Sequence, residues 1–321
     1  MIRRISHNKV FILRYLKIIV LVLSAWLLYR EILVKDRFRE NFSAIVNGEV
    51  PFDWIWLIPV FILLFANWAL ETLKWQVLIR SFAQPRFLLS YKAILTGVFV
   101  SFFTPNRVGE FAGRVIYLKE KKVEASLLTI AGSLAQNVCT YLFGSLAALF
   151  FFAEEPIEWV LGGTVLFFLT TTLLFLYFNI DRLVGILRII RLPKKWMKYF
   201  LPIRRLTRMQ LLKALGLSAF RYAVFSIQFV LMFKVLAIPI SFGMALQGVG
   251  LSFLIQSVLP TIALLEVASR GVAAHYAFQV TPGFEASILF ASYAIWLINL
   301  FLPGMVGAFL FLFNNKKDVD L

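Results

Sequence analysis

The sequence predicts an all-α polytopic membrane protein, and three observations support that class. Of its 321 residues, 60% are hydrophobic, above the roughly 45–50% that is usual in soluble domains. The apolar residues come in runs of about 20, the length that an α-helix needs to cross the hydrocarbon core of a bilayer. The 33 Lys and Arg residues lie mostly between these runs. This distribution is typical of membrane topology signals and anionic-lipid contacts rather than of a nucleic-acid-binding domain.

Six segments are long and apolar enough to be spanning helices, namely 11–30, 54–73, 125–152, 157–179, 212–236 and 286–313. In the first, an apolar run from Ile18 to Tyr29 follows five basic residues and has no small-residue cleavage site after it, so we interpret this segment as a spanning helix and not as a cleaved signal peptide. Aromatic anchors at the membrane surface are expected from Trp54, Trp56, Trp68 and Trp75.

The basic residues also predict an orientation. If the N-terminus is cytoplasmic, the inner segments are 1–17, 74–92, 119–122, 181–213 and the C-terminal tail, and they hold 24 of the 33 Lys and Arg residues. Short inner loops of membrane proteins are enriched in these residues. Both termini are therefore predicted to be cytoplasmic.

Two further apolar segments, 88–118 and 241–280, are interrupted by proline and by charge. Lys92 and Lys119 flank the first and belong on the same side, so the chain should enter the membrane, turn near Pro105 and return. The second segment breaks at Pro260 and has limbs of near 20 residues. Because that length suffices for a crossing, it predicts either a re-entrant hairpin or two full spans.

The two breaks have similar sequences. Ser101, Pro105 and Glu110-x-x-x-Arg114 in the first correspond to Ser257, Pro260 and Glu266-x-x-x-Arg270 in the second. Each break lies between two predicted spans, and the two halves have opposite overall directions. This pattern predicts an inverted-topology repeat with broken helices, an architecture that places a binding site near the bilayer midplane.

The charges at these breaks are the candidate site. An uncompensated charge at membrane depth costs at least about 2.5–3.5 kcal/mol, so each Glu–Arg pair, on one helix face at i,i+4, is expected to be neutralised, hydrated or bound to a polar ligand. The N–H groups of a helix beginning after each proline, with nearby Arg side chains, suit an anion such as a lipid phosphate. The predicted substrate-binding residues are Thr104, Pro105, Asn106, Arg107, Glu110, Arg114, Pro260, Thr261, Glu266 and Arg270. The alternative is that the pairs only hold the two hairpins together.

Other polar residues have weaker signals. The secondary cavity candidates are Ser101, Gln136, Asn137, Ser257 and His275. Glu71 and Lys74 are interpreted as a surface ion pair at an inner helix end. Arg221 and Lys234 are expected to extend toward opposite membrane faces.

The segment 181–213 and the cysteine count complete the expectations. Ten Lys and Arg residues interleave with apolar ones over 181–213, which predicts an amphipathic surface helix on anionic lipid, broken at Pro193. Cys139 is the single cysteine and there are two histidines, so no disulfide, metal site, cofactor or catalytic group is expected.

The first break resembles a known family. Thr104-Pro105-Asn106-Arg107-Val-Gly109-Glu110 is similar to the Thr-Pro-Gly-Arg-x-Gly-Glu signature of the lysylphosphatidylglycerol synthase transmembrane family, with Asn106 in place of glycine. The stretch from Pro260 to Glu266 resembles the second family motif but lacks its glycines. The resemblance implies a stand-alone flippase domain in the inner (cytoplasmic) membrane, without an aminoacyl-transferase domain.

The predicted function is a lipid translocase for a polar-headgroup phospholipid or aminolipid, passive or ion-coupled. A membrane enzyme acting on a lipid-linked substrate and a non-transporting scaffold subunit are the alternatives. We expect a single membrane domain over 1–321, composed of an N-terminal part (1–50), a first repeat (51–153), a connecting part (154–210) and a second repeat (211–321). Expected partners are phospholipids, with anionic lipid at 181–213, and a second copy of the chain.

Overall fold

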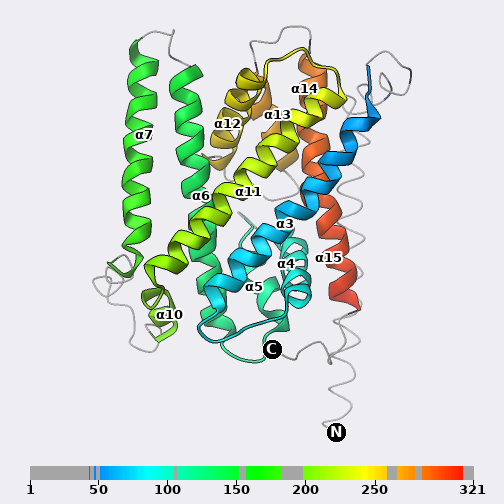
Figure 1. Ribbon diagram of the computed structural model, residues 1–321. Helices are drawn as coiled ribbons and strands as arrows, with labels where there is room; N and C mark the ends of the chain where they lie inside the picture. Colours follow the sequence, from blue (N-terminus) through cyan, green and yellow to red (C-terminus); the bar gives the residue numbers. More distant parts are fainter. Residues whose placement is uncertain are drawn as a thin grey trace.

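The protein is helical throughout the part that the structure describes. This computed structural model describes residues 51–104, 107–151, 157–182, 198–258, 266–278 and 284–313, together with Ser43 and Asn47, and all regular elements within them are helices. Five of these are long and apolar enough to cross a membrane: Trp54–Ile79, Lys122–Phe151, Val160–Phe178, Arg208–Val235 and Glu285–Leu312. The predicted span 11–30 lies outside the described residues. The predicted polytopic all-α class is confirmed (Figure 1).

The spanning helices begin and end close to the predicted positions. They are α3 (Leu57–Ile79, after the 3₁₀ turn η2, Trp54–Trp56), α6 (Lys122–Phe151), α7 (Ile157–Phe178), α11 (Arg208–Val235), and the last span formed by α14 (Glu285–Trp296), the π-helical η5 (Leu297–Phe301) and α15 (Leu302–Leu312). The largest difference is in α3, which ends at Ile79 rather than at residue 73. α11 begins at Arg208, where Thr207 and Gln210 form a capping box. Between α7 and α11 lie η4 (Lys198–Phe200) and α10 (Leu201–Arg204), and residues 183–197 of the predicted amphipathic segment are outside the described part.

Both interrupted segments are hairpins of short helices. The first is α4 (Phe87–Ser101) and α5 (Gly109–Arg114), followed by the 3₁₀ turn η3 (Val115–Tyr117), and the second is α12 (Phe242–Val258) and α13 (Glu266–Ala277). Helices of 15 and 17 residues are about 22 and 26 Å long, which is shorter than the roughly 30 Å hydrocarbon core. Figure 1 shows the two hairpins at opposite ends of the molecule. For 241–280, the 12 residues of α13 are fewer than a crossing needs, which favours the re-entrant alternative, and the choice between the two stays a prediction.

A constant offset of 156 residues relates the two halves. It connects Ser101 to Ser257 and Glu110 to Glu266, and it carries the last residue of α3, Ile79, onto the last residue of α11, Val235. The equivalence extends to hydrogen bonds. Ser101 Oγ donates to a carbonyl oxygen three residues earlier at 2.6 Å, and Ser257 Oγ does the same at 2.6 Å. The repeat predicted from the two sequence breaks is therefore present in the helices as well.

Each hairpin packs against the last helix of the other half, α4 against α15 and α12 against α6. Glycines allow these contacts. A Cβ on Gly307 would lie 1.9 Å from the Leu95 carbonyl oxygen, and one on Gly144 would lie 2.8 Å from Leu254 Cβ. Small residues let helix backbones approach closely in membranes, where dispersion contacts rather than water exclusion drive association. The two halves are thus interlocked.

The tryptophans of α3 differ from expectation. Trp54 is 69% exposed, as an interfacial anchor should be, but Trp68 and Trp75 are buried. The reason is that α3 packs along α11, so the side of α3 that carries these residues faces protein. The prediction of interfacial anchors is wrong for Trp68 and Trp75.

The last span is distorted where a buried polar contact reaches it. An α-helix would satisfy the Asn299 carbonyl with the N–H of residue 303, which is proline and has none. Trp68 Nε1 donates to this carbonyl at 3.2 Å, and Asn67 Nδ2 donates to Asn299 Oδ1 at 3.2 Å. The π-helical turn at 297–301 thus presents both polar groups of Asn299 to α3.

We expect Trp68→Phe to destabilise the wild-type protein by about 1 kcal/mol more than it destabilises the Pro303→Ala variant. The reason is that Pro303 lacks the N–H that would otherwise bind the Asn299 carbonyl, so this carbonyl depends on the indole of Trp68. Thermal unfolding of the four proteins of this double-mutant cycle in detergent measures the difference. Equal costs of Trp68→Phe in the two backgrounds would contradict this account of the bend.

Candidate functional site

Glu71 is the centre of a buried ionic network. Its Oε1 accepts from Arg114 Nη2 at 2.8 Å, and its Oε2 accepts from Lys74 Nζ at 2.7 Å and from Arg221 Nη1 at 2.9 Å. Glu71, Lys74 and Arg114 are all buried. The predicted surface pair between Glu71 and Lys74 is therefore wrong, because α3 continues past them and other helices cover them.

Three elements bring these charges together. Lys74 lies one turn after Glu71 on α3, and Arg221 comes from α11, the antiparallel neighbour of α3. Arg114 comes from α5, which lies against α4 at a glycine–glycine contact. A Cβ on Gly113 would be 2.6 Å from Gly97 Cα. This close approach of the two hairpin limbs positions Arg114 so that its side chain reaches α3.

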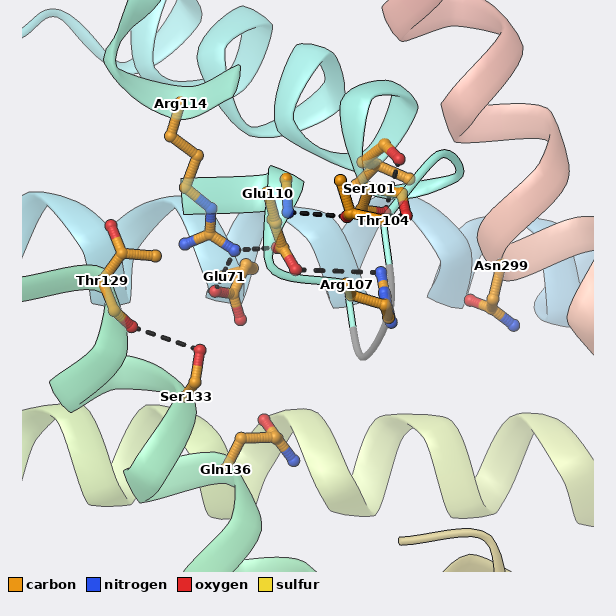
Figure 2. A network of polar contacts seen from close by, with 12 residues as sticks. Glu71, Ser101, Thr104, Arg107, Glu110, Arg114, Thr129, Ser133, Gln136 and Asn299 are labelled. Carbon is orange, nitrogen blue, oxygen red and sulfur yellow. Dashed lines mark hydrogen bonds and ion pairs between the residues drawn. The ribbon is translucent and has the colours of Figure 1, made fainter. Parts of the chain in front are cut away.

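The hairpin itself supplies the rest of the ionic network. Arg114 Nη2 also donates to Glu110 Oε1, which confirms the predicted i,i+4 pair. Arg107 Nη2 lies 3.9 Å from Glu110 Oε2, and Arg107 has a left-handed backbone with φ of 60°. Non-glycine residues rarely adopt this conformation and do so most often at functional sites. Figure 2 shows Arg107, Glu110, Arg114 and Glu71 in one connected group.

The start of α5 does not offer free N–H groups. Gly109 N–H donates to Thr104 Oγ1 at 2.7 Å. The next two N–H groups donate to carbonyl oxygens three residues back, at 3.0 and 3.1 Å. The prediction that this helix N-terminus would hold an anion is wrong, because the turn before it already satisfies these donors. Pro105 and Asn106 lie outside the described residues, so their predicted roles stay predictions.

Arg221 extends the ionic network toward the last span. Its Nε donates to Asn67 Oδ1 at 2.9 Å and its Nη1 to Gln136 Oε1 at 3.5 Å, and its guanidinium lies 5.1 Å from the centre of the Trp68 ring. The prediction that Arg221 extends to a membrane face is wrong, because these partners hold it inside. Lys234, by contrast, is exposed and lies 4.4 Å from the centre of the Trp56 ring.

Sequence reasoning missed five members of this network, one of which is Arg221 on α11. Asn67, Glu71 and Lys74 share α3, and Asn299 lies in the last span. A signal was present, because Asn67 and Glu71 stand four residues apart within an apolar run and so share one helix face.

A cavity of about 340 Å³ opens beside this network. Its walls come from α3, α5, α6, α11 and the turn before α5. The lining residues are Glu71, Lys74, Arg107, Glu110, Phe111, Arg114, Ile130, Ser133, Leu134, Gln136, Asn137 and Arg221. Four are cationic and two are anionic, so the lining has a formal net charge of +2. Two of the predicted secondary candidates, Gln136 and Asn137, line this cavity.

The chain matches the family model for the lysylphosphatidylglycerol synthase TM region over residues 15–313. The protein belongs to this family. The match covers nearly the whole chain, so it includes both hairpins and the cavity. Comparisons with curated proteins and with solved structures gave no significant match.

The second hairpin of this lysylphosphatidylglycerol synthase TM region contributes none of the described cavity-lining residues. Arg270 is buried and its guanidinium lies 6.0 Å from the centre of the Phe225 ring, one turn along α11 from Arg221. His275 is exposed. Pro260, Thr261 and the side chain of Glu266 lie outside the described part, so the predicted site at this hairpin stays a prediction.

The charge distribution does not follow the structural repeat. The offset of 156 residues carries Glu71 onto Ile227, which is 41% exposed, and carries Phe65, which is 65% exposed, onto Arg221. The residue equivalent to Glu71 thus cannot neutralise Arg270. The family fold is doubled in this chain, but the described ionic network is centred on Glu71 of the first half, and Arg221 is its charged member from the second half.

Proposed function

We propose that this protein is a lipid translocase that moves a polar-headgroup phospholipid or aminolipid between leaflets. The observation that carries the proposal is the cavity with four cationic and two anionic side chains among membrane-spanning helices. Ionisable groups at such depth are costly and usually mark a substrate or ion pathway. Membership of the lysylphosphatidylglycerol synthase TM family supports the same function.

The position of the cavity suits a substrate with one polar and one apolar end. Ile130 and Asn137, both on α6, line the cavity and are the most exposed of its lining residues on that helix. A headgroup at Arg107 and Gln136 would therefore reach the bilayer past α6, and its acyl chains would stay in lipid. The two hairpins enter from opposite ends (Figure 1), which is the arrangement that permits alternating access in inverted repeats. We expect both termini to be cytoplasmic, so that this cavity would lie nearer the inner leaflet.

Leaflet-resolved transport in proteoliposomes tests the proposal. We expect Arg107→Gln to slow lipid translocation about tenfold, because a charge-assisted hydrogen bond to a headgroup contributes about 1.5–3 kcal/mol. The Arg107 side chain makes no hydrogen bond in the described part of the chain and is partly exposed, so the variant should remain folded. Arg80→Gln, on an exposed turn after α3, is the matched control and should transport normally.

Transport by Arg107→Gln at the wild-type rate would count against this site. Absence of translocation by the wild-type protein, together with loss of cellular function when 188–208 is deleted, would instead favour the scaffold alternative. Product formation from a lipid-linked substrate by the purified protein would favour the enzyme alternative.

A further inference from the structure

We infer that the cavity selects lipids with an accessible anionic phosphate, above all a phosphate monoester, and excludes cationic aminoacyl headgroups. This inference rests on the proposed function and specifies the substrate class of the same cavity. Three features of the first hairpin and its neighbours carry it: the carboxylates are occupied, cationic donors remain, and the net charge is positive.

Three of the four carboxylate oxygens in the cavity already accept a charged hydrogen bond, and the fourth, Glu110 Oε2, faces Arg107. Glu71 Oε1 accepts from Arg114, and Glu71 Oε2 accepts from both Lys74 and Arg221. Glu110 Oε1 accepts from Arg114, and its Oε2 faces Arg107 at 3.9 Å. A lipid ammonium group could approach only Glu110 Oε2, and to bind there it would have to displace Arg107. It would then leave that cation without a partner inside the protein, which is strongly unfavourable.

The arginines of the cavity have N–H donors without a described hydrogen-bond partner. Arg114 Nε and Arg107 Nε are buried and have no hydrogen-bond partner in the described part of the chain. The Arg114 side chain is only 4% exposed, so water reaches it poorly, whereas the Arg107 side chain is 31% exposed toward the cavity. An unsatisfied buried donor costs roughly 1–3 kcal/mol. Because both Nε atoms are covered, an anion in the cavity would accept first from the exposed part of the Arg107 guanidinium, and phosphate has the geometry that arginine prefers.

The net charge sets the preferred headgroup. The cavity lining has a formal net charge of +2, and a phosphate monoester has a charge of about −1.5 to −2 at pH 7. A phosphodiester carries one negative charge, and a zwitterionic headgroup carries none. A lysyl ester of phosphatidylglycerol has two ammonium groups and one phosphodiester, so it would add positive charge to a positive cavity. Charge interactions are strongest in such a low-dielectric setting.

The size of the cavity agrees with a headgroup rather than a whole lipid. Small-molecule sites range from about 300 to 1,000 Å³, and this cavity, at about 340 Å³, is near the lower limit. Apolar Phe111, Ile130 and Leu134 also line it. A compact phosphate with its ester oxygen fits this combination, with the acyl chains leaving across Ile130.

Proteoliposomes containing acyl-labelled lipids test the inference. We expect phosphatidic acid to move fastest, phosphatidylglycerol next, then phosphatidylethanolamine, and lysylphosphatidylglycerol at least about tenfold more slowly than phosphatidic acid. Gln136→Glu replaces an amide with a carboxylate of the same shape and lowers the formal net charge of the cavity lining to +1. This variant should transport phosphatidic acid severalfold more slowly than the wild type does. The ratio of the phosphatidic acid rate to the lysylphosphatidylglycerol rate should also be smaller. Gln84→Glu, on an exposed loop, is the matched control.

A binding measurement separates the lipid from a free anion. Tryptophan emission reports the cavity because Arg221 stacks on Trp68. Dispersed short-chain phosphatidic acid should change this emission at far lower concentration than inorganic phosphate does, and Arg107→Gln should weaken its binding about tenfold. Tighter binding of inorganic phosphate would show a free-anion site and overturn the lipid assignment.

The outcomes distinguish this inference from the proposed function. If lysylphosphatidylglycerol moves as fast as phosphatidic acid, the inference is wrong and the translocase function stands. If no lipid moves but phosphatidic acid binds through Arg107, the translocase function is wrong and the ligand class stands. If neither transport nor binding occurs, both are wrong.

Discussion

Glu71→Gln should lower the unfolding temperature of the protein in detergent by about 5–15 °C. The carboxylate of Glu71 is bonded to Arg114, Lys74 and Arg221, and the described network holds only one other acid, Glu110. Removing one partner of a buried ion pair costs about 3–5 kcal/mol, and each kcal/mol corresponds to roughly 2–4 °C in a protein of this size class. The amide would leave three cations around a neutral side chain.

A second change tests whether charge is the cause. Lys74→Met keeps the length of the side chain and removes one cation, so Glu71→Gln with Lys74→Met should be more stable than Glu71→Gln alone. Glu120→Gln, on an exposed loop, is the control for the substitution itself and should unfold at the wild-type temperature. If the unfolding temperature of Glu71→Gln lies within about 1 °C of that of the wild type, the cations around Glu71 do not need its carboxylate for stability.

Gly307→Ala is expected to disrupt the contact between the two halves and abolish transport. The added Cβ would meet the Leu95 carbonyl oxygen at 1.9 Å and the Leu95 carbonyl carbon at 2.5 Å. These are backbone atoms, so rotating a side chain does not relieve the clash, and α15 and α4 must separate. Overpacking of this kind costs about 1–3 kcal/mol or more. Leu95→Ala should fail to restore the protein, because the clash does not involve the Leu95 side chain.

Gly216→Ala is the matched control for this change. Gly216 is on α11 and has no atom within 4 Å of the position of an added Cβ. Alanine there should be neutral or stabilising, since glycine in a helix is disfavoured by up to about 1 kcal/mol. Unfolding temperature and lipid transport should be measured for both variants. Equal behaviour of the two variants would show that the α4–α15 contact is looser than the structure indicates.

Much of the architecture is readable in the sequence because the bilayer imposes simple rules on it. A span must be apolar over a fixed length, so α6, α7, α11 and the last span were predicted to within a few residues. A helix break in the membrane must be marked by residues such as Pro105, and a charge there must be compensated. The same rules predicted the pairing of Glu110 with Arg114.

The ionic network was only partly readable. Glu71 and Lys74 were interpreted as a surface pair, because a window of apolar residues does not show which neighbour will cover the end of a helix. Asn299 gave no signal at all, since its role depends on Pro303 and on the indole of Trp68. The contacts of Asn299 join residues more than 200 positions apart in the chain, and those of Glu71 with Arg114 and Arg221 join residues 43 and 150 positions apart.

The sequence by itself determined that this is a polytopic membrane protein, that it is a doubled structure and that its breaks carry charge. Only the tertiary structure decided which charges meet. Helix periodicity fixes the neighbours of a residue along its own helix, and so the sequence could join Glu110 to Arg114. The partners of Glu71 come from α5 and α11, and the close glycine contacts of the hairpin bring them there. The positive charge of the cavity follows from that three-dimensional arrangement, in which four cations surround two acids.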